Sequence, residues 1–151
     1  MPIIKWGDKV KNSEELLTSV LHTVQMGQIG IRAVNDSAVK SGLRQELDRQ
    51  LKEYDRIEKD ALQLAQIRGW ELGNVNPIVR QMSKIMSQVR LLGGDVDSKI
   101  AGMLIQGNTR GVILGVKNLN RYDKKDDQIS YLAQELLNKE NINIQKTQPY
   151  L

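Results

Sequence analysis

The chain has 151 residues, of which 40% are hydrophobic and 26% are charged, a composition typical of one globular domain. It contains no cysteine, which excludes disulfides, cysteine nucleophiles and zinc–thiolate sites. No apolar run approaches the length needed to cross a bilayer, and the first residues lack the apolar core of a secretory signal. We therefore expect a soluble, cytoplasmic protein with an N-terminal extension (1–12), one helical domain (13–140) and a loose tail (141–151).

The formal net charge is +4, and the basic excess lies in the middle of the chain. Residues 77–122 carry seven basic and two acidic side chains, whereas residues 1–76 carry eleven of each. This bias is far weaker than that of nucleic-acid-binding domains. It therefore indicates a solvated surface.

The first two predicted helices form a hairpin. Asn12 or Ser13 caps the first helix, which runs to about Lys40, and Gly42 lies at the turn into a second helix over about 43–68. Gaps of three and four residues separate the apolar and small residues of both helices, which places each set on one face. The first set is Leu17, Val20, Val24, Gly27, Ile31, Val34 and Ala38, and the second is Leu43, Leu47, Gln50, Tyr54, Ile57, Ala61 and Leu64.

Residues 69–76 break this period, and Pro77 suits the first position of a third helix. The glycine pair at 93–94 ends that helix, and a fourth covers about 95–122. After a polar break, apolar residues over 129–136 predict a short fifth helix. The expected fold is all-α: an antiparallel up-and-down four-helix bundle with a short fifth C-terminal helix.

Three glycines lie four residues apart on one face of the fourth helix, at Gly107, Gly111 and Gly115. Each lowers helix propensity by about 1 kcal/mol relative to alanine, so an interaction must offset the loss. We predict a helix-contact face where a bulky side chain such as Trp70 or Tyr54 comes near. The alternative is a cleft for a flat ligand.

The first and fourth helices each carry a second apolar stripe opposite the main one. A helix at the outside of a monomeric bundle needs only one such stripe, and a short fifth helix covers too little surface to bury two more. The pattern predicts a homodimer whose partners share one patch across a two-fold axis. The predicted dimer face comprises Met26, Ile29, Ala33, Ile105, Val112 and Val116.

A basic strip follows one flank of the fourth helix, through Lys99, Arg110, Lys117 and Arg121. It is a candidate anion-binding strip, although such flanks are usually solvated. No aromatic residues interleave with it to stack bases, which argues against nucleic acid as the partner.

Two stretches carry a resemblance to a known family: Val24-Gln25-Met26-Gly27 and Met103-Leu104-Ile105-Gln106-Gly107-Asn108-Thr109-Arg110-Gly111-Val112, with weak support from Asn76-Pro77. The chain resembles ferritin-like four-helix-bundle proteins, in particular an uncharacterised group from anaerobic Gram-positive bacteria. The resemblance implies a di-iron site built from glutamates and two Glu-x-x-His motifs. This sequence has one histidine, His22, and no Glu-x-x-His motif, so we expect the iron ligands to be absent.

Two glutamates of the second helix could be remnants of such ligands, Glu46 and Glu53. They alternate with Arg49 and Arg56 at helical spacing, which favours a ladder of ion pairs instead. His22 has no serine or aspartate partner that the sequence identifies. We therefore predict no catalytic, metal or cofactor-binding residues and no cofactor.

The predicted function is that of a non-enzymatic helical bundle acting by self-association or by binding a protein partner. A drifted ferritin-like metal-binding protein and a basic nucleic-acid-associated bundle are the two alternatives.

Overall fold

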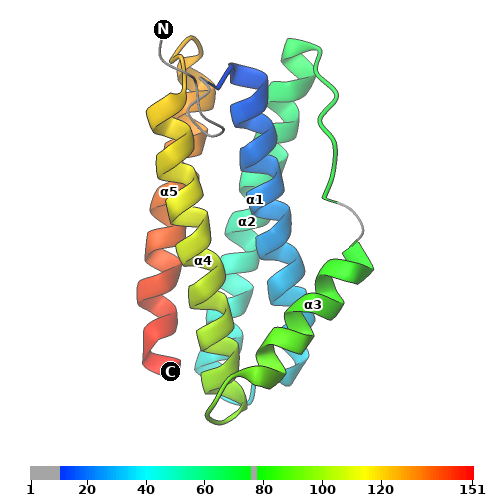
Figure 1. The fold of residues 1–151 in the computed structure, drawn as a ribbon, viewed down its shortest axis with the longest axis vertical. Coiled ribbons are helices and arrows are strands. Elements are labelled where there is room, and N and C mark those ends of the chain that lie inside the picture. The colour runs from blue at the N-terminus through cyan, green and yellow to red at the C-terminus, as the bar shows by residue number, and fades with distance from the viewer. Residues whose placement is uncertain (1–10, 76–77) are drawn as a thin grey trace, which may run out of the picture.

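The computed structural model describes residues 11–75 and 78–151. This part of the chain forms five α-helices and two 3₁₀ turns. The α-helices are α1 (Ser13–Val34), α2 (Ser41–Arg68), α3 (Ile78–Leu91), α4 (Val96–Arg121) and α5 (Asp127–Thr147), and the turns are η1 (Asn35–Ser37) and η2 (Gln148–Tyr150). Four helices run along the long axis of the molecule, and α3 slants across one side of it (Figure 1). The predicted all-α class is confirmed. The N-terminal extension up to residue 10 and the Asn76-Pro77 pair lie outside the described residues.

Side-chain caps set the starts of three helices. Asn12 accepts a hydrogen bond from the backbone N–H of Glu15, and Asp95 accepts one from that of Ser98. Asp126 caps α5 in the same way. These oxygens satisfy backbone donors that have no partner inside the helix. No helix in the described part of the chain is long and apolar enough to cross a membrane.

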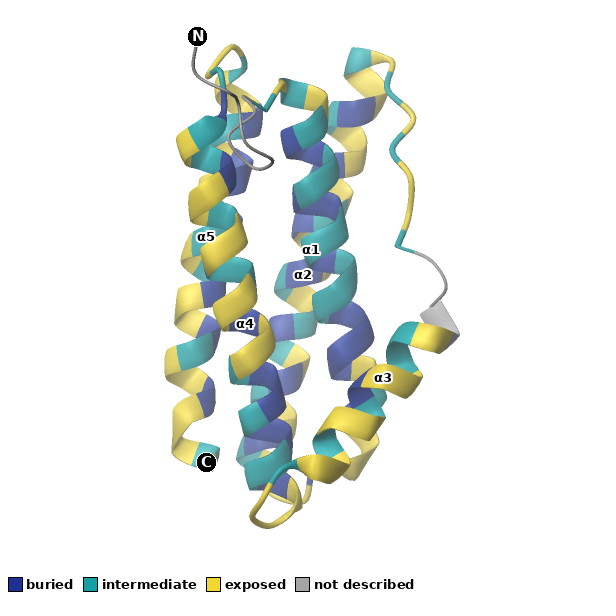
Figure 2. Cartoon of the chain, in the orientation of Figure 1, coloured by how far each residue is buried: buried dark blue, intermediate teal, exposed yellow. Residues whose placement is uncertain are grey.

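The core lies among the long helices, and the predicted seams of the first two helices face it (Figure 2). The fully buried side chains include Leu17, Val24, Ile31, Leu43, Leu47, Ile57, Ile100 and Ile129. Burying these side chains removes apolar surface from water, which stabilises the folded state by about 25 cal/mol for each Å² buried and is the main favourable term in folding.

The hairpin turn differs from its prediction. α1 ends at Val34 rather than near Lys40, and α2 begins at Ser41, so Gly42 lies in the first turn of α2. Asp97 of α4 holds the connection: its Oδ1 accepts from the N–H of Val39 at 2.8 Å and its Oδ2 from that of Lys40 at 2.9 Å. These backbone donors hold the pKa of Asp97 below its ordinary value.

The expected short fifth helix and loose tail are wrong. α5 has 21 residues, and residues 141–147 continue it. The apolar period stops after Leu136, but the polar side chains that follow at the same spacing, Glu140, Asn143 and Thr147, are buried against the other helices. Hydrogen bonds to those helices take the place of apolar contacts and keep the helix intact.

Direct contacts fasten the N-terminal end of α1 to the C-terminal end of α4. The N–H of Lys11 donates to the carbonyl of Arg121 at 2.9 Å, and the N–H of Asp123 donates to the carbonyl of Lys11 at 3.2 Å. The hydroxyls of Ser13 and Tyr122 lie 2.8 Å apart. These bonds tie one end of α4 to the start of α1, and Asp97 ties its other end to the connection that leads into α2.

Candidate functional site

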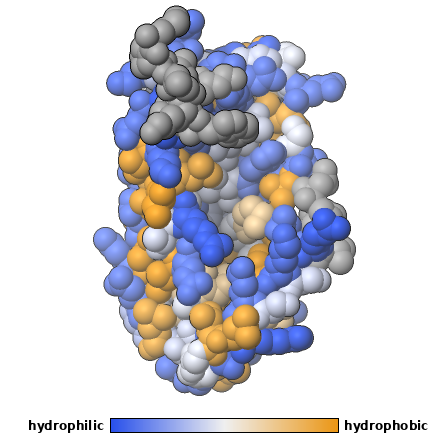
Figure 3. All heavy atoms as spheres, viewed as in Figure 1, coloured by the Kyte–Doolittle hydropathy of each residue, from blue (hydrophilic) through white to orange (hydrophobic). Residues whose placement is uncertain are grey.

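A cleft of about 970 Å³ separates the middle of α1 from the middle of α4, with α3 along one border. Figure 3 shows this face of the molecule hollowed between the helices. Two glycines of α1, Gly27 and Gly30, and two of α4, Gly107 and Gly111, lie in its walls. Its apolar lining comprises Met26, Ile31, Ile85, Met103, Leu104 and Leu114.

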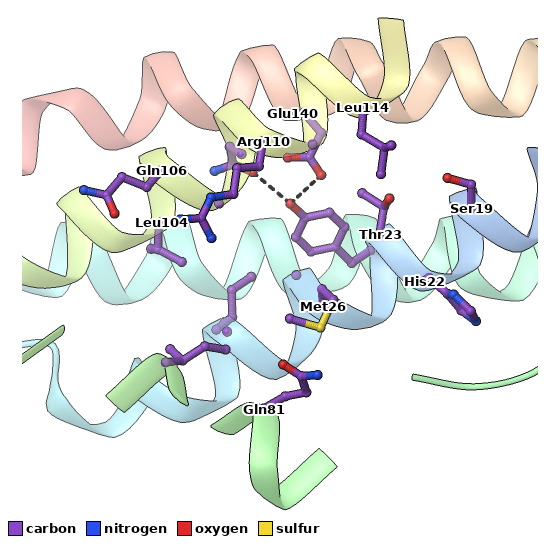
Figure 4. Close-up of a pocket in the computed structure, with 18 of the residues that line it drawn as sticks. Ser19, His22, Thr23, Met26, Gln81, Leu104, Gln106, Arg110, Leu114 and Glu140 are labelled. Carbon is purple, nitrogen blue, oxygen red and sulfur yellow. Dashed lines mark hydrogen bonds between the residues drawn. The ribbon is translucent and has the colours of Figure 1, made fainter. Parts of the chain in front are cut away.

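The floor of the cleft is polar and lies at the centre of the bundle. Tyr54 of α2 and Glu140 of α5 are 3% and 2% exposed. The hydroxyl oxygen of Tyr54 lies 3.0 Å from both the Oδ1 of Asn108 and the Oε1 of Glu140, as the dashed lines in Figure 4 mark. The amide of Asn143 donates to the same hydroxyl at 3.3 Å. Residues from α2, α4 and α5 therefore converge on one phenolic oxygen.

The hydrogen bonds of this cluster are compatible with a neutral acid. A phenol has one proton, so Tyr54 can donate to only one of its two acceptors. Both contacts are satisfied when Glu140 carries a proton and donates it to the tyrosine oxygen, while the hydroxyl donates to Asn108. Burial raises the pKa of Glu140 to about 8, which agrees with this arrangement at neutral pH. Burial, with Glu140 next to it, also raises the pKa of Tyr54 well above its ordinary value.

The second carboxyl oxygen of Glu140 faces the cleft. No hydrogen bond from a described residue reaches this oxygen, Oε2. No fully enclosed side-chain oxygen or nitrogen among the described residues lacks a partner, so Oε2 is open to the cleft that Glu140 lines. A Cβ on Gly111 would lie 3.0 Å from Oε2, and its absence keeps the approach clear.

Neighbouring residues hold the floor in place. A Cβ on Gly27 would lie 2.6 Å from two ring carbons of Tyr54, so only glycine lets the ring lie against α1. The guanidinium of Arg49 donates to the Oδ1 of Asn143 at 3.1 Å, which orients the asparagine amide toward Tyr54. The floor is therefore fixed by α1 as well as by the helices that contribute its polar atoms.

The three predicted glycines of α4 do not share one role. Gly111 and Gly115 lie against α5, where an added Cβ would be 3.0 Å from Glu140 and 3.4 Å from Leu137. Gly107 has nothing within 4 Å of such a Cβ and lines the cleft. The contact is with α5 and not with Trp70 or Tyr54, because the longer α5 packs along this flank.

Of the three α1 residues in the predicted dimer face, one is buried within the chain. Ile29 is 6% exposed, and Met26 and Ala33 are half-buried. The slanting α3 covers this stripe, with Ile85 next to Gly30. The third helix was not among the covers that the prediction weighed, which were the fifth helix and the segment around Trp6, and Trp6 lies outside the described residues.

The α4 half of that face is only partly covered. Ile105 and Val112 are half-buried, whereas Val116 is 43% exposed and the neighbouring Ile113 is 52% exposed. The homodimer itself stays a prediction.

The basic strip lies mostly outside the cleft. Arg110 alone among its members lines the cleft, at an exposed position. Lys99 and Arg121 are half-buried, and Lys117 is exposed elsewhere on α4. The strip therefore does not form one continuous anion site with the cleft.

The iron site that the resemblance implies does not fit these residues. Within residues 11–75 and 78–151, no three His, Cys, Asp or Glu side chains lie close enough together to hold a metal ion. The floor offers one neutral carboxyl beside a phenol and two amides, whereas iron needs several anionic ligands. Glu46 and Glu53 form ion pairs with Arg49 and Arg56, which confirms the ladder.

His22 serves a structural contact. Its Nε2 lies 2.6 Å from the carbonyl oxygen of Gly73, so the ring attaches the loop after α2 to α1. The side chain also borders the cleft (Figure 4).

Sequence reasoning missed Glu140, Asn108 and Asn143. The available signal was spacing, because Glu140 and Asn143 lie four and seven residues after Leu136 and continue its face of the helix. Polar residues at core positions of a helix are expected to bind one another, and this pair does so through Tyr54.

Comparisons with known proteins bear on the fold alone. No protein-family model matches the chain, and no curated protein matches it either. Among solved structures, it is similar to a conserved hypothetical protein, rv2844, from Mycobacterium tuberculosis, with a TM-score of 0.71 and 11% identity over 92% of this chain and 96% of that chain. This similarity supports the all-helical architecture and carries no information about ligands.

Proposed function

We propose that the protein is a non-enzymatic binding protein with a ferritin-like bundle of α1, α2, α4 and α5, and that a small apolar molecule binds in the cleft between α1 and α4. The observation that carries this proposal is the cleft itself, about 970 Å³ in volume, which has glycines in both walls and reaches a buried polar floor. Small-molecule sites of roughly 300–1,000 Å³ with mainly apolar linings and a few polar groups are typical of proteins.

The chemistry of the lining supports binding rather than catalysis. Glu140 and Tyr54 are hydrogen-bonded to each other and to asparagine amides, and no serine, threonine or lysine side chain of the described residues that could act as a nucleophile is hydrogen-bonded to either of them. Among the described lining residues, His22 is committed to a backbone carbonyl and activates no serine or threonine that an observed hydrogen bond identifies. A nucleophile paired with a base is therefore missing from this part of the chain.

A neutral, apolar fluorescent dye such as N-phenylnaphthylamine tests the proposal. The dye should bind the wild-type protein, and Gly107→Leu should weaken binding at least tenfold, because the new side chain enters open space in the cleft. Gly93→Leu is the matched control, since Gly93 is exposed outside the cleft and also has no neighbour within 4 Å of an added Cβ. Equal dye binding by both variants and the wild type would contradict the proposal.

Self-association is the second candidate, because the exposed side chains of Ile113 and Val116 form an apolar area on α4. Sedimentation at micromolar concentration should then give a dimer, and Val116→Glu should shift it to the 17.1 kDa monomer. A wild-type monomer would reject this candidate and leave the cleft proposal intact.

A further inference from the structure

The chemistry of the cleft floor narrows the class of ligand. Apart from backbone groups, the floor presents the Oε2 of Glu140 as an acceptor without a partner among the described residues, on a side chain that is 2% exposed. A ligand that donates a hydrogen bond to this acceptor gains affinity. The hydroxyl of Tyr54 and the Oδ1 of Asn108 already have partners.

We propose that the cleft floor is a subsite for the amino group of an amphipathic amine, whose ammonium donates to the Oε2 of Glu140 while its apolar body lies along the cleft. This inference rests on the proposed function, because it assigns the ligand class for the same cleft. The apolar body would contact Met26, Leu104 and Leu114, which line the cleft beside the floor (Figure 4).

Charge favours an amine over a carboxylate or an alcohol. Glu140 is the acid of the floor, and an ammonium beside it stabilises its ionised form. A carboxylate ligand would meet a second carboxyl at the floor and would suffer repulsion once Glu140 ionises. An alcohol could donate one hydrogen bond but would gain no ion pair.

The other charged and titratable groups around the cleft are weaker influences on the floor. They are Lys11, Glu14, Glu15 and His22 near α1, Tyr54 and Arg49 of α2, Lys84 of α3 and Arg110 of α4. Lys84 and Arg110 are exposed and form no ion pair with a described residue, so water and salt screen them. Glu140 is buried, where an ion pair is screened much less.

Binding of an amine at this subsite is linked to release of a proton. The ammonium ligand keeps its charge, the protonated carboxyl of Glu140 gives its proton to solvent, and an ion pair remains. Because burial holds the pKa of Glu140 at about 8, affinity should rise as the pH increases toward 8, by up to tenfold per pH unit. Above pH 8 it should level off until the ligand amine itself loses its proton.

Three ligands with the same chain and different head groups test the inference: octylamine, octanol and octanoate. Each competes with N-phenylnaphthylamine for the full-length protein at pH 7.5. We expect octylamine to displace the dye at a concentration at least tenfold lower than octanol or octanoate does. Equal potency of the three, or a preference for octanoate, would overturn the amine subsite.

Two variants localise the effect. Glu140→Gln should abolish the preference for octylamine over octanol, with both ligands measured on the same variant, and the matched control Glu15→Gln at the rim should keep the preference. If Glu140→Gln does not fold, the wild-type protein still decides, because octylamine affinity that is constant from pH 6 to pH 8 contradicts the inference. Failure of the dye to bind rejects the proposed function, whereas dye binding without a head-group preference rejects the amine subsite alone.

Discussion

The two flanks of α4 pack differently. Toward α5, Gly111 and Gly115 allow close contact, so that an added Cβ would lie 3.0 and 3.4 Å from side chains of that helix. Toward α1, Gly107 borders open space of the cleft. Tight packing on the α5 flank offsets the loss of helix propensity at its glycines. On the α1 flank no contact within the described chain offsets it, and a bound molecule would supply the missing contact.

The largest expected effect is at Glu140, where the two flanks meet. Since its pKa is about 8 when folded and 4.5 in its ordinary state, the folded protein retains a proton that the unfolded chain releases. The free energy of unfolding should therefore fall as the pH rises from about 4.5 to 8, by up to roughly 5 kcal/mol from this group. Glu140→Gln should remove that loss and be more stable than the wild type at pH 9, as urea denaturation at pH 5 and pH 9 would measure. If the free energy of unfolding changed with pH in the same way in the wild type and in Glu140→Gln, a buried neutral acid at Glu140 would be contradicted.

The next largest effect contrasts Gly111 with Gly107. Gly111→Leu should lower the free energy of unfolding by about 3 kcal/mol or more, because its side chain collides with Glu140. Gly107→Leu should cause no such loss, since its side chain enters the cleft. Thermal melts of the two variants give the comparison directly, and equal melting temperatures would show that the two flanks do not differ.

The smallest expected effect is an increase in stability. Gly107→Ala should stabilise the protein by up to about 1 kcal/mol, because alanine has the higher helix propensity and nothing lies within 4 Å of its methyl group. Chemical denaturation resolves a change of this size. A loss of stability would mean that the cleft wall at Gly107 is in contact with another part of the chain.

The sequence predicted the elements that local rules govern. The apolar seams of α1 and α2 and the cap at Asn12 depend on spacing and on neighbouring residues, and the structure confirms them. The length of α5 was missed because Glu140 and Asn143 interrupt the apolar period with polar side chains. Their partners lie on other helices, so a search for apolar spacing cannot identify them as core residues.

The site was predicted only in outline. Glycine spacing in the fourth helix raised the alternative of a cleft, but three glycines with one spacing could not show which of them faces a neighbour. The meeting of Tyr54, Asn108 and Glu140 depends on contacts 54 and 86 residues apart along the chain. The slant of α3, which covers Ile29 and borders the cleft, likewise follows from packing among helices rather than from any local pattern.

The bonds at the two ends of α4 have a consequence for the kinetics of binding. Lys11 pairs with the backbone at the C-terminal end of α4, and Asp97 holds Val39 and Lys40 at its N-terminal end. These bonds restrain α4 at both ends, against the start of α1 at one end and against the start of α2 at the other, and they favour a cleft whose width is set before a ligand arrives. Such preorganisation avoids the entropy loss of closing a mobile site, and it leaves diffusion and desolvation as the steps that set the association rate.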